Sequence, residues 1–434
     1  MKILISTWGN PRNWDKVKYN YKDTQKETKD PLTLIIEKEK IDKTVIISID
    51  TLADEEIKDE LISSYKDLKN KAKEIIKNFC DQELGVSSNK IIISYGVGEF
   101  NKTRFIGNAM DYYYAIFKEL AFFFKKELES PSSKEIEVFL DISHGINFLP
   151  VLTYRALREI LQILAYSFEI NLIVLNSDTY LRTARPSELN VNIIERTKVL
   201  PKLIGYFYEK GILEPFEVFV NHLNGYEKRE LSSKDNKFPG SLYFFLSAFM
   251  HCLPVFVIYY LPQIDNLEEK INKLSEIFEE KISIDKNQNN KLDIKRKFKF
   301  NINFENLIKS FLASWILNIN GFTKKKDINL KEIEKLKNKI WSKEKFPIET
   351  NSIDVEIEYI KKLNPSSEYQ SYAKLLNDKE KDNIDKRNFF AHRGFEHNII
   401  MLRKNDKNEI EISINTAFEK KINFLKNNLP KVKK

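Results

Sequence analysis

Short apolar runs alternate with longer amphipathic stretches over the first 180 residues of the chain. Five runs rich in Ile and Val have the length and composition of buried strands, at 2–6, 44–50, 90–95, 136–142 and 171–176. Stretches with helical periodicity separate most of these runs, at 53–79, 105–128 and 149–168. Because strands joined by helical crossovers pair in parallel, the pattern predicts a Rossmann-like α/β domain with a mainly parallel sheet over residues 1–185.

The alternation stops near residue 185. Residues 186–239 are expected to form a helical linker region of short helices, broken by Pro201, Gly211 and Pro215. Residues 240–434 are expected to form an α-helical domain. Its predicted elements are helices at 240–281, 303–319, 331–341 and 368–394, an exposed loop at 284–297, and a small hairpin over 399–414 that turns at 404–408. The predicted fold class is therefore α/β plus α.

One apolar segment inside this helical domain has the length of a membrane span. Residues 242–261 contain no charged side chain over twenty positions. His251 and Pro254 lie at its centre, however, and no second segment of this kind exists. We therefore expect a buried helix in a helical core or a dimer interface, and no membrane association.

Cysteine content and the N-terminal residues bear on the cellular compartment. Cys80 and Cys252 are the two cysteines, far apart in the chain, so neither a disulfide framework nor a cysteine-based zinc site is supported. The apolar run at the N-terminus breaks at Trp8, too soon for a signal peptide. These features favour a cytoplasmic protein.

Positive charge is concentrated in the last third of the chain. Residues 281–434 hold 34 Lys and Arg against 21 Asp and Glu, whereas residues 1–280 hold 37 against 42. A basic domain of this kind attracts polyanions such as RNA or DNA. A solvated, lysine-rich surface without a nucleic-acid partner would give the same count.

Three loops follow predicted strands at one edge of the sheet, where Rossmann-like domains bind ligands. They are STWGNPRNW (6–14), YGVGEFN (95–101) and DISHGIN (141–147). Gly96, Gly98 and Gly145 allow backbone N–H groups to approach a phosphate, and Ser143, His144 and Asn147 lead into a helix whose N-terminus favours anions. A nucleotide-like anion would suit this edge, although glycine-rich turns also end strands that bind nothing.

Several common chemistries lack their motifs. Neither G-x-G-x-x-G nor G-x-x-x-x-G-K-[ST] occurs, which argues against a dinucleotide cofactor and against a P-loop NTPase. Neither H-E-x-x-H nor a cluster of His and Cys residues occurs, so no metal site is predicted.

The segment RNFFAHRGF (387–395) carries the strongest catalytic pattern. On a helix, Asp385, Asn388 and His392 share one arc, and the Asn388 amide is spaced to orient the His392 imidazole. Phe389 and Phe390 lie on the other side and can anchor the helix, which Gly394 is expected to end as a C-cap.

Arg387 and His392 are about 140° apart on such a helix and are poorly placed to touch each other. A second copy of the helix, packed across a two-fold axis, would bring two Arg and two His side chains into one cleft. Metal-free RNA cleavage uses this combination, with imidazole for proton transfer and guanidinium for the charge on the phosphorane. A surface arginine and a capping histidine remain the simpler alternative.

Together, STWGNP, DISHGIN and RNFFAH resemble the CRISPR-associated CARF-HEPN ribonucleases of type III systems. The resemblance implies a homodimer whose CARF domains bind a cyclic oligoadenylate as an allosteric activator, with cyclic tetra-adenylate as the expected ring. Binding would switch on metal-independent cleavage of single-stranded RNA in the HEPN domains, with no other cofactor. It implies Arg387, Asn388 and His392 as catalytic residues. The implied ligand residues are Ser143, His144, Gly145, Asn147, Trp8, Gly9, Asn10, Gly96, Val97 and Gly98.

Two other classes of function remain open on the residues alone. A non-catalytic, nucleotide-responsive regulator would use the same first domain and a basic helical domain that only binds nucleic acid. A membrane-attached effector would use residues 242–261. The ring size of the activator, the RNA base preference and any assembly beyond a dimer are not encoded in these motifs.

Overall fold

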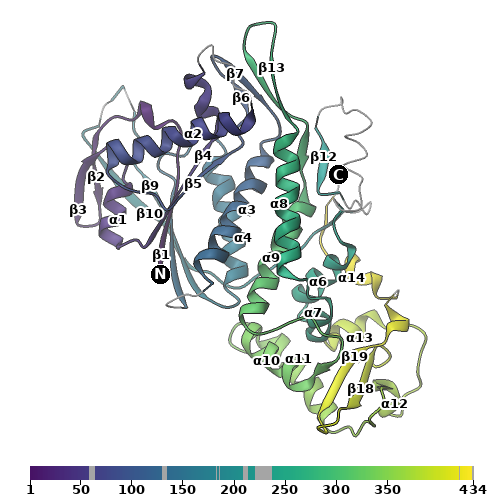
Figure 1. Cartoon of the computed structure of the whole chain (residues 1–434). Coiled ribbons are helices and arrows are strands. Elements are labelled where there is room, and N and C mark those ends of the chain that lie inside the picture. The colour runs from purple at the N-terminus through teal and green to yellow at the C-terminus, as the bar shows by residue number, and fades with distance from the viewer. Residues whose placement is uncertain are drawn as a thin grey trace.

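The structure is a computed structural model of the whole chain. It describes residues 1–57, 64–129, 134–181, 183–184, 186–208, 214–219, 237–419 and 421–432. Gly211, expected to break a helix, lies outside these ranges, as do the last two residues of the basic tail. Figure 1 shows an α/β layer at the N-terminal end, a group of helices beside it, and a smaller C-terminal part with its own strands.

An eight-stranded sheet forms the core of the N-terminal part, in the order β3-β2-β10-β9-β8-β1-β4-β5. Five neighbouring strands are parallel and coincide with the five apolar runs of the sequence, which confirms those predictions. They are β1 (Lys2–Thr7), β4 (Lys43–Ile49), β5 (Lys90–Ser94), β8 (Glu135–Asp141) and β9 (Glu169–Ser177). Their central residues are fully buried, as expected for strands covered on both faces.

The helices that connect the parallel strands lie on both faces of the sheet. The chain moves outward from β1 to β4 and β5 through α1 (Leu32–Glu39) and α2 (Tyr65–Phe79), then returns to β8 and β9 through α3 (Met110–Glu127) and α4 (Leu149–Leu164). Right-handed crossovers therefore place α1 and α2 on one face and α3 and α4 on the other. The strand order reverses between β1 and β8, which is the position where such sheets open a crevice at their carboxyl ends.

The beginning of the expected helical linker is a strand. Glu188–Lys198 form β10, which pairs antiparallel with β9 and parallel with β2 (Val17–Tyr21), itself joined to β3 (Thr24–Thr28). The prediction of short helices is wrong here, and the sheet continues beyond residue 185. Further on, two short strands, β11 (Phe207–Tyr208) and β12 (Phe216–Val218), pair with strands near the C-terminus and before α9.

The apolar segment 242–261 is buried, as predicted, but it is not one helix. It forms α6 (Gly240–Met250) and α7 (Pro254–Tyr260), separated at Pro254, and is followed by α8 (Ile264–Glu280). Proline lacks the N–H that a continuous helix would need at this position. Within the part of the chain that the structure describes, no helix has the length and apolarity needed to cross a membrane.

Residues 284–297, expected to be an exposed loop, form most of a β-hairpin. Its strands are β13 (Ile282–Lys286) and β14 (Leu292–Arg296), and β14 pairs in parallel with β7 (Thr103–Ile106) of the first domain. Arg296 is fully buried there, with Nη1 3.8 Å from Asp50 Oδ2 and Nε 3.6 Å from Asp111 Oδ2. A charged side chain from the second half of the chain is thus part of the interior of the first domain.

The group of helices beside the sheet contains a long, central helix. α9 (Ile302–Ile319) is buried along almost its whole length and packs against α3, α4 and α8. It is followed by β16 (Ile328–Asn329), α10 (Leu330–Ile340) and α11 (Pro347–Lys361). The predicted hairpin is confirmed as β18 (Ile400–Lys404) and β19 (Ile410–Ile414), in a sheet ordered β16-β19-β18-β17.

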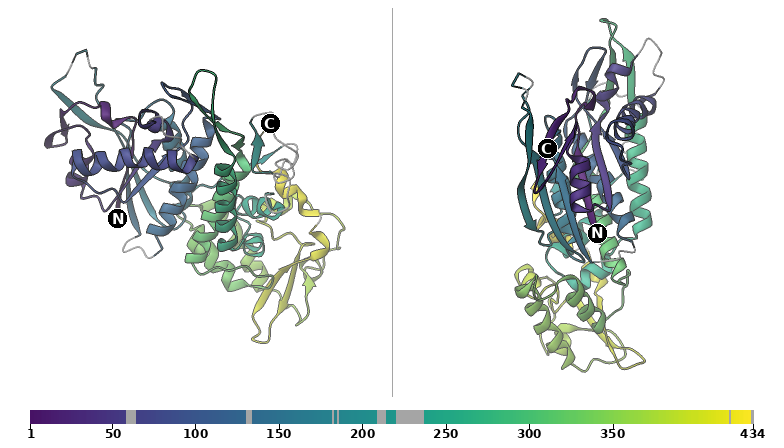
Figure 2. Two further views of the ribbon diagram at one scale, coloured as in Figure 1. Left: turned by 45° about the horizontal axis from the view of Figure 1, so that its top comes forward. Right: turned by 90° about the vertical axis from the view of Figure 1, so that its left-hand side faces the viewer.

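The stretch 368–394 is much less helical than predicted. It contains β17 (Gln370–Ser371), α12 (Tyr372–Leu375), and, after a polar turn region, α13 (Lys386–Ala391). Asp385 begins α13 as its N-cap and accepts hydrogen bonds from the N–H groups of Arg387 and Asn388. The polar run 377–385 has no apolar face to bury, so it does not continue a helix. The two views in Figure 2 show this C-terminal part set apart from the large sheet.

Candidate functional site

The first candidate site is a pocket of about 560 Å³ at the carboxyl ends of the sheet strands. It lies at the reversal between β1 and β8, where ligands of Rossmann-like domains are held. Three of the expected ligand residues line it, Ser143, His144 and Gly145, together with residues after β1 and β9 that the sequence did not single out. Those further residues include Trp14, Tyr19, Asn176, Asp178 and Tyr180.

A buried carboxylate holds the DISHGIN loop. Oδ1 of Asp141 accepts hydrogen bonds from the N–H and the hydroxyl of Ser143, and Oδ2 accepts one from the hydroxyl of Ser6. The Ser143 hydroxyl also accepts a hydrogen bond from the N–H of Ser177. Ser143 therefore ties the ends of β8 and β9 together, and its hydroxyl is engaged in the structure of the pocket wall.

His144 is the best-supported ligand residue. Its ring stacks on Trp14, with ring centroids 3.9 Å apart and an angle of 27° between the planes, and its Nε2 lies 3.0 Å from the hydroxyl of Tyr19. Burial lowers the pKa of His144 to about 4. The imidazole is therefore neutral at neutral pH, so it offers hydrogen bonding and stacking to a ligand and no positive charge.

Not all of the expected ligand residues reach this pocket. The Trp8 side chain is fully buried, and its indole N–H donates a hydrogen bond to the Ser6 hydroxyl. Trp8 therefore packs in the core beneath the loop and does not line the pocket. The N–H of Gly9 donates to the His144 carbonyl, and a Cβ atom at Gly9 would lie 2.8 Å from Ile146. The others are outside the pocket lining: Asn10, Gly96, Val97, Gly98 and Asn147.

Gly96 belongs to the buried arginine cluster instead. Its N–H donates to Asp50 Oδ1 at 2.7 Å, and its carbonyl accepts a hydrogen bond from Arg296 Nη2 at 2.7 Å. A Cβ atom at this position would lie 2.4 Å from Thr51. The requirement for glycine at residue 96 is therefore explained by close packing.

The second candidate site is built on α13 in the C-terminal part. Phe389 is fully buried against Phe256 of α7 and against Phe424, which confirms its predicted anchoring role. The helix ends at His392, and the next two residues, Arg393 and Gly394, have positive φ values. Gly394 packs against Phe256 so closely that a Cβ atom would lie 3.0 Å from its ring.

The His392 imidazole is oriented by a carboxylate that the sequence pattern did not reveal. Nδ1 of His392 lies 2.7 Å from Oε1 of Glu356 on α11. The Glu356 side chain is 5% exposed, whereas the His392 side chain is 45% exposed. The expectation that the Asn388 amide would orient the imidazole is therefore wrong; the link between these two residues is a backbone hydrogen bond.

With Glu356 ionised, the N–H of the neutral imidazole is on Nδ1, and Nε2 carries a free electron pair. This is the arrangement that a general base needs.

Burial, and next the charge of Glu356, raise the pKa of the neighbouring Tyr372 hydroxyl above its ordinary value, so this tyrosine stays neutral.

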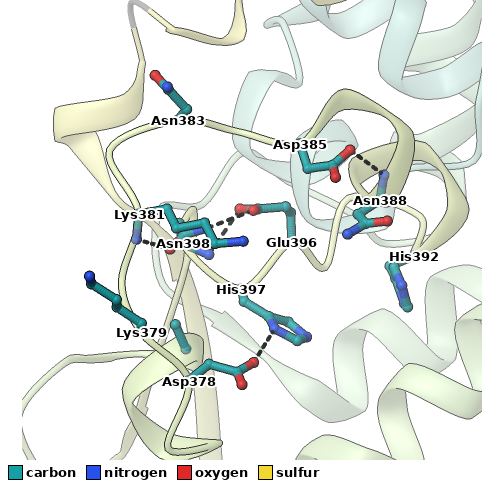
Figure 3. A pocket seen from close by; sticks show the side chains of 11 residues that line it. Asp378, Lys379, Lys381, Asn383, Asp385, Asn388, His392, Glu396, His397 and Asn398 are labelled. Carbon is teal, nitrogen blue, oxygen red and sulfur yellow. Dashed lines mark hydrogen bonds and ion pairs between the residues drawn. The ribbon is translucent and has the colours of Figure 1, made fainter.

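Asn388 and His392 line a pocket of about 300 Å³ with nine other residues, as Figure 3 shows. Arg387 is exposed and is not part of the lining, which agrees with the predicted separation of Arg387 and His392 on one helix. The remaining lining residues are Ala373, Asp378, Lys379, Lys381, Asn383, Asp385, Glu396, His397 and Asn398.

Comparison with known proteins identifies both parts of the chain. Residues 3–179 match the family described as CRISPR system endoribonuclease Csx1, CARF domain, and residues 324–416 match the HEPN domain of the same family. The chain is also 31% identical to the CRISPR system endoribonuclease Csx1 of Methanocaldococcus jannaschii over 465 aligned positions, which cover 98% of this chain and 92% of the relative. The chain belongs to the Csx1 family.

The two Csx1 domain matches divide the candidate sites between them. The CARF match contains His144 and most of the strand-end pocket, except Tyr180 and Leu189, and the HEPN match contains α11, α13 and the pocket around His392. Residues 180–323 lie between the matches and supply β10, α6 to α9 and the hairpin that carries Arg296. The resemblance to CARF-HEPN ribonucleases seen in the sequence is therefore confirmed.

Glu356 and Trp14 were missed because local sequence gives no signal for either. Glu356 is one of several carboxylates on α11, and only the packing of that helix selects it as the partner of His392. Trp14 follows a turn after β1 and reaches the pocket through the same loop as Gly9. Among the residues described, no group of three or more His, Cys, Asp or Glu side chains is arranged to hold a metal ion.

Proposed function

We propose that this chain is an endoribonuclease that cleaves single-stranded RNA without a metal ion, in type III CRISPR antiviral defence, when a cyclic oligoadenylate binds its CARF pocket. The observation that carries the proposal is the contact between Glu356 and His392. A buried carboxylate fixes a half-exposed imidazole in a pocket inside the HEPN region.

In the proposed reaction, Nε2 of His392 takes the proton of a ribose 2′-hydroxyl. The 2′-oxygen attacks the adjacent phosphorus, and the bond from phosphorus to the 5′-oxygen breaks. The leaving 5′-oxygen takes up a proton from a protonated group of the site or from water, so the products are a 2′,3′-cyclic phosphate and a 5′-hydroxyl. Glu356 accepts the Nδ1–H hydrogen bond throughout and stabilises the imidazolium that forms, so proton removal at Nε2 becomes easier.

Arg387 is proposed to stabilise the negative charge of the phosphorane. Its exposure and its place outside the pocket of its own chain are consistent with a contribution to a second copy across a two-fold axis. The proposed active form is therefore a homodimer with composite sites. Asn388 lines the same pocket as His392 and can donate its amide N–H to a phosphate oxygen.

At the other end of the molecule, the proposed activator is a cyclic oligoadenylate, with cyclic tetra-adenylate as the expected ring. The pocket around His144 offers aromatic rings for adenine stacking and neutral polar groups for base edges. The loop 143–147 leads into the N-terminus of α4, and a helix N-terminus favours phosphate. Of the residues expected from the sequence, we retain Ser143, His144 and Gly145 as pocket residues.

The proposal is tested by incubating single-stranded RNA with the protein in EDTA, with each of several cyclic oligoadenylates. Cleavage that depends on one ring and disappears in His392→Ala is the expected result. RNA binding without cleavage under every condition would instead favour a non-catalytic regulator. Mass spectrometry of the products would contradict the proposed chemistry if the 3′ ends carried no cyclic phosphate or its hydrolysis product.

A further inference from the structure

The HEPN pocket contains a second histidine whose Nδ1 contacts a carboxylate. This carboxylate, Asp378, is 56% exposed, whereas Glu356 is 5% exposed. Nδ1 of His397 lies 3.0 Å from Oδ2 of Asp378, and its ring centroid is 6.3 Å from that of His392. Figure 3 shows the two imidazoles next to each other, with the Asp378 contact to His397 drawn. In both rings a carboxylate contacts Nδ1, so Nε2 remains available for proton transfer.

We propose that His397 is a second catalytic residue, which gives the proton to the leaving 5′-oxygen while His392 takes the proton of the 2′-hydroxyl. This inference rests on the proposed function. Cleavage by attack of the 2′-hydroxyl needs both proton transfers, and one imidazole cannot serve both at the same moment. One protomer would then hold the complete acid–base pair, and the second copy would supply the arginine.

The spacing of the rings suits one phosphate group bound by both. The attacking and leaving oxygens lie on opposite sides of the phosphorus, and each needs a hydrogen bond of about 2.8 Å to one imidazole. The ring centroids are 6.3 Å apart and the planes are inclined by 47°. Two imidazoles at this separation can both reach oxygens of the same phosphate group.

The backbone around His397 is held by contacts to α12 and by hydrogen bonds within its own turn. Its carbonyl accepts a hydrogen bond from the N–H of Ala373, and Tyr372 packs edge-on against its ring at 4.9 Å. The preceding residue, Glu396, is buried and accepts hydrogen bonds from the N–H groups of Asn398 and Ile399. These contacts fix the backbone that carries the His397 side chain.

The charged groups around His397 come from three segments. They are Asp378, Lys379, Lys381 and Asp385 of the polar turn region, His392 and Glu396 of the segment after α13, and Glu356 of α11 through its contact with His392. Tyr372 contributes a neutral hydroxyl from α12. The two lysines are exposed and can bind the phosphates that flank the cleaved bond.

The test compares wild type, His397→Gln and Lys407→Gln in single-turnover cleavage as a function of pH. Lys407 is an exposed residue at the hairpin turn and serves as a control with the same replacement side chain. We expect His397→Gln to lower the maximal rate by about 10²–10⁴-fold and to remove the alkaline limb of the profile, because a general acid must be protonated. The control should retain the wild-type profile.

A second measurement uses RNA with sulfur in place of the leaving 5′-oxygen at the mapped cleavage site. A thiolate leaves without a proton, so His397→Gln should approach the wild-type rate on this substrate, whereas His392→Gln should not. Retention of both pH limbs, with the same loss on oxygen and sulfur substrates, would overturn the proposal and assign His397 a structural role. Failure of the wild type to cleave RNA at all would overturn the proposed function instead.

Discussion

The buried carboxylate of Glu356 contacts Nδ1 of His392 at 2.7 Å, although 36 residues separate the two in the chain. The contact joins α11 to the residue that ends α13. It fixes which nitrogen of the imidazole faces the pocket. The activity proposed for the HEPN region therefore depends on a helix that carries no recognisable motif.

Glu356→Gln should lower the cleavage rate by about 10²-fold or more while substrate affinity changes little. Glutamine preserves size, but its amide can donate to Nδ1, which would leave the proton on Nε2 and remove the base. Glu358→Gln, an exposed position on the same helix, provides the matched control. Equal rates for the two variants in single-turnover assays would remove Glu356 from the mechanism.

Two inactive variants should restore activity when they are mixed. If Arg387 of one chain serves His392 of the other, a heterodimer of Arg387→Ala and His392→Ala chains contains one intact site and one site that lacks both groups. Cleavage should therefore reappear after subunit exchange, and neither variant should show it alone. Absence of activity in verified heterodimers would mean that Arg387 and His392 act within one chain.

His144→Ala should weaken cyclic tetra-adenylate binding by about 10-fold, the effect of one lost hydrogen bond or stacking contact. Because burial lowers the pKa of His144 to about 4, its ionisation should not alter affinity between about pH 5.5 and 8. Calorimetric titrations at several pH values test both statements, with circular dichroism as the control for folding. An affinity that rises steeply as the pH falls towards 5.5 would show that the imidazole becomes charged in the complex.

Arg296→Met should destabilise the protein by about 3–5 kcal/mol at pH 8, because Asp50 and Asp111 would remain buried without their cation. Burial raises the pKa of each of these carboxyls to about 6. A carboxyl with a raised pKa loses its contribution to stability as the pH rises through that value. At about pH 5 both carboxyls are mostly neutral and need no cation, so the destabilisation caused by Arg296→Met should be smaller than at pH 8.

Urea unfolding at the two pH values measures this difference. Lys295→Met, one residue earlier and partly exposed, is the control. A loss of stability that is the same at both pH values would mean that packing of the arginine stem, and not its charge, stabilises this region.

The five central strands were predictable because burial on both faces requires continuous runs of Ile and Val, as at Val45–Ile49. Strand β10 was not predictable, because Glu188–Lys198 carry charged side chains at exposed positions and have no continuous apolar run. This segment becomes a strand only by pairing with β9 and with β2, which lies far away in the sequence. The hairpin with Arg296 was predicted to be a polar loop because its sequence is also rich in charged residues. Its burial depends on Asp50 and Asp111, which are distant in sequence.

The candidate sites divide in a similar way. His144 and His392 stand in short motifs whose neighbours, Gly145 and Phe389, have local structural roles that a sequence can suggest. The partners that orient them, Trp14 and Glu356, are defined only when separate elements pack together. Trp8 was wrongly predicted to line the pocket, because sequence alone does not say whether a side chain in a loop points to the ligand or to the core. The alternation of side chains along the preceding strand determines that direction.

The parallel pairing of β7 with β14 also sets an order of events during synthesis. The ion pair between Arg104 and Asp293 joins the two strands across 189 residues of chain. At ordinary translation rates, roughly 10–40 s pass between the emergence of one strand and the other. Throughout that interval the nascent N-terminal domain has an unpaired strand edge and two carboxylates that still lack their cation, so it completes folding only after the first helices of the second half have left the ribosome.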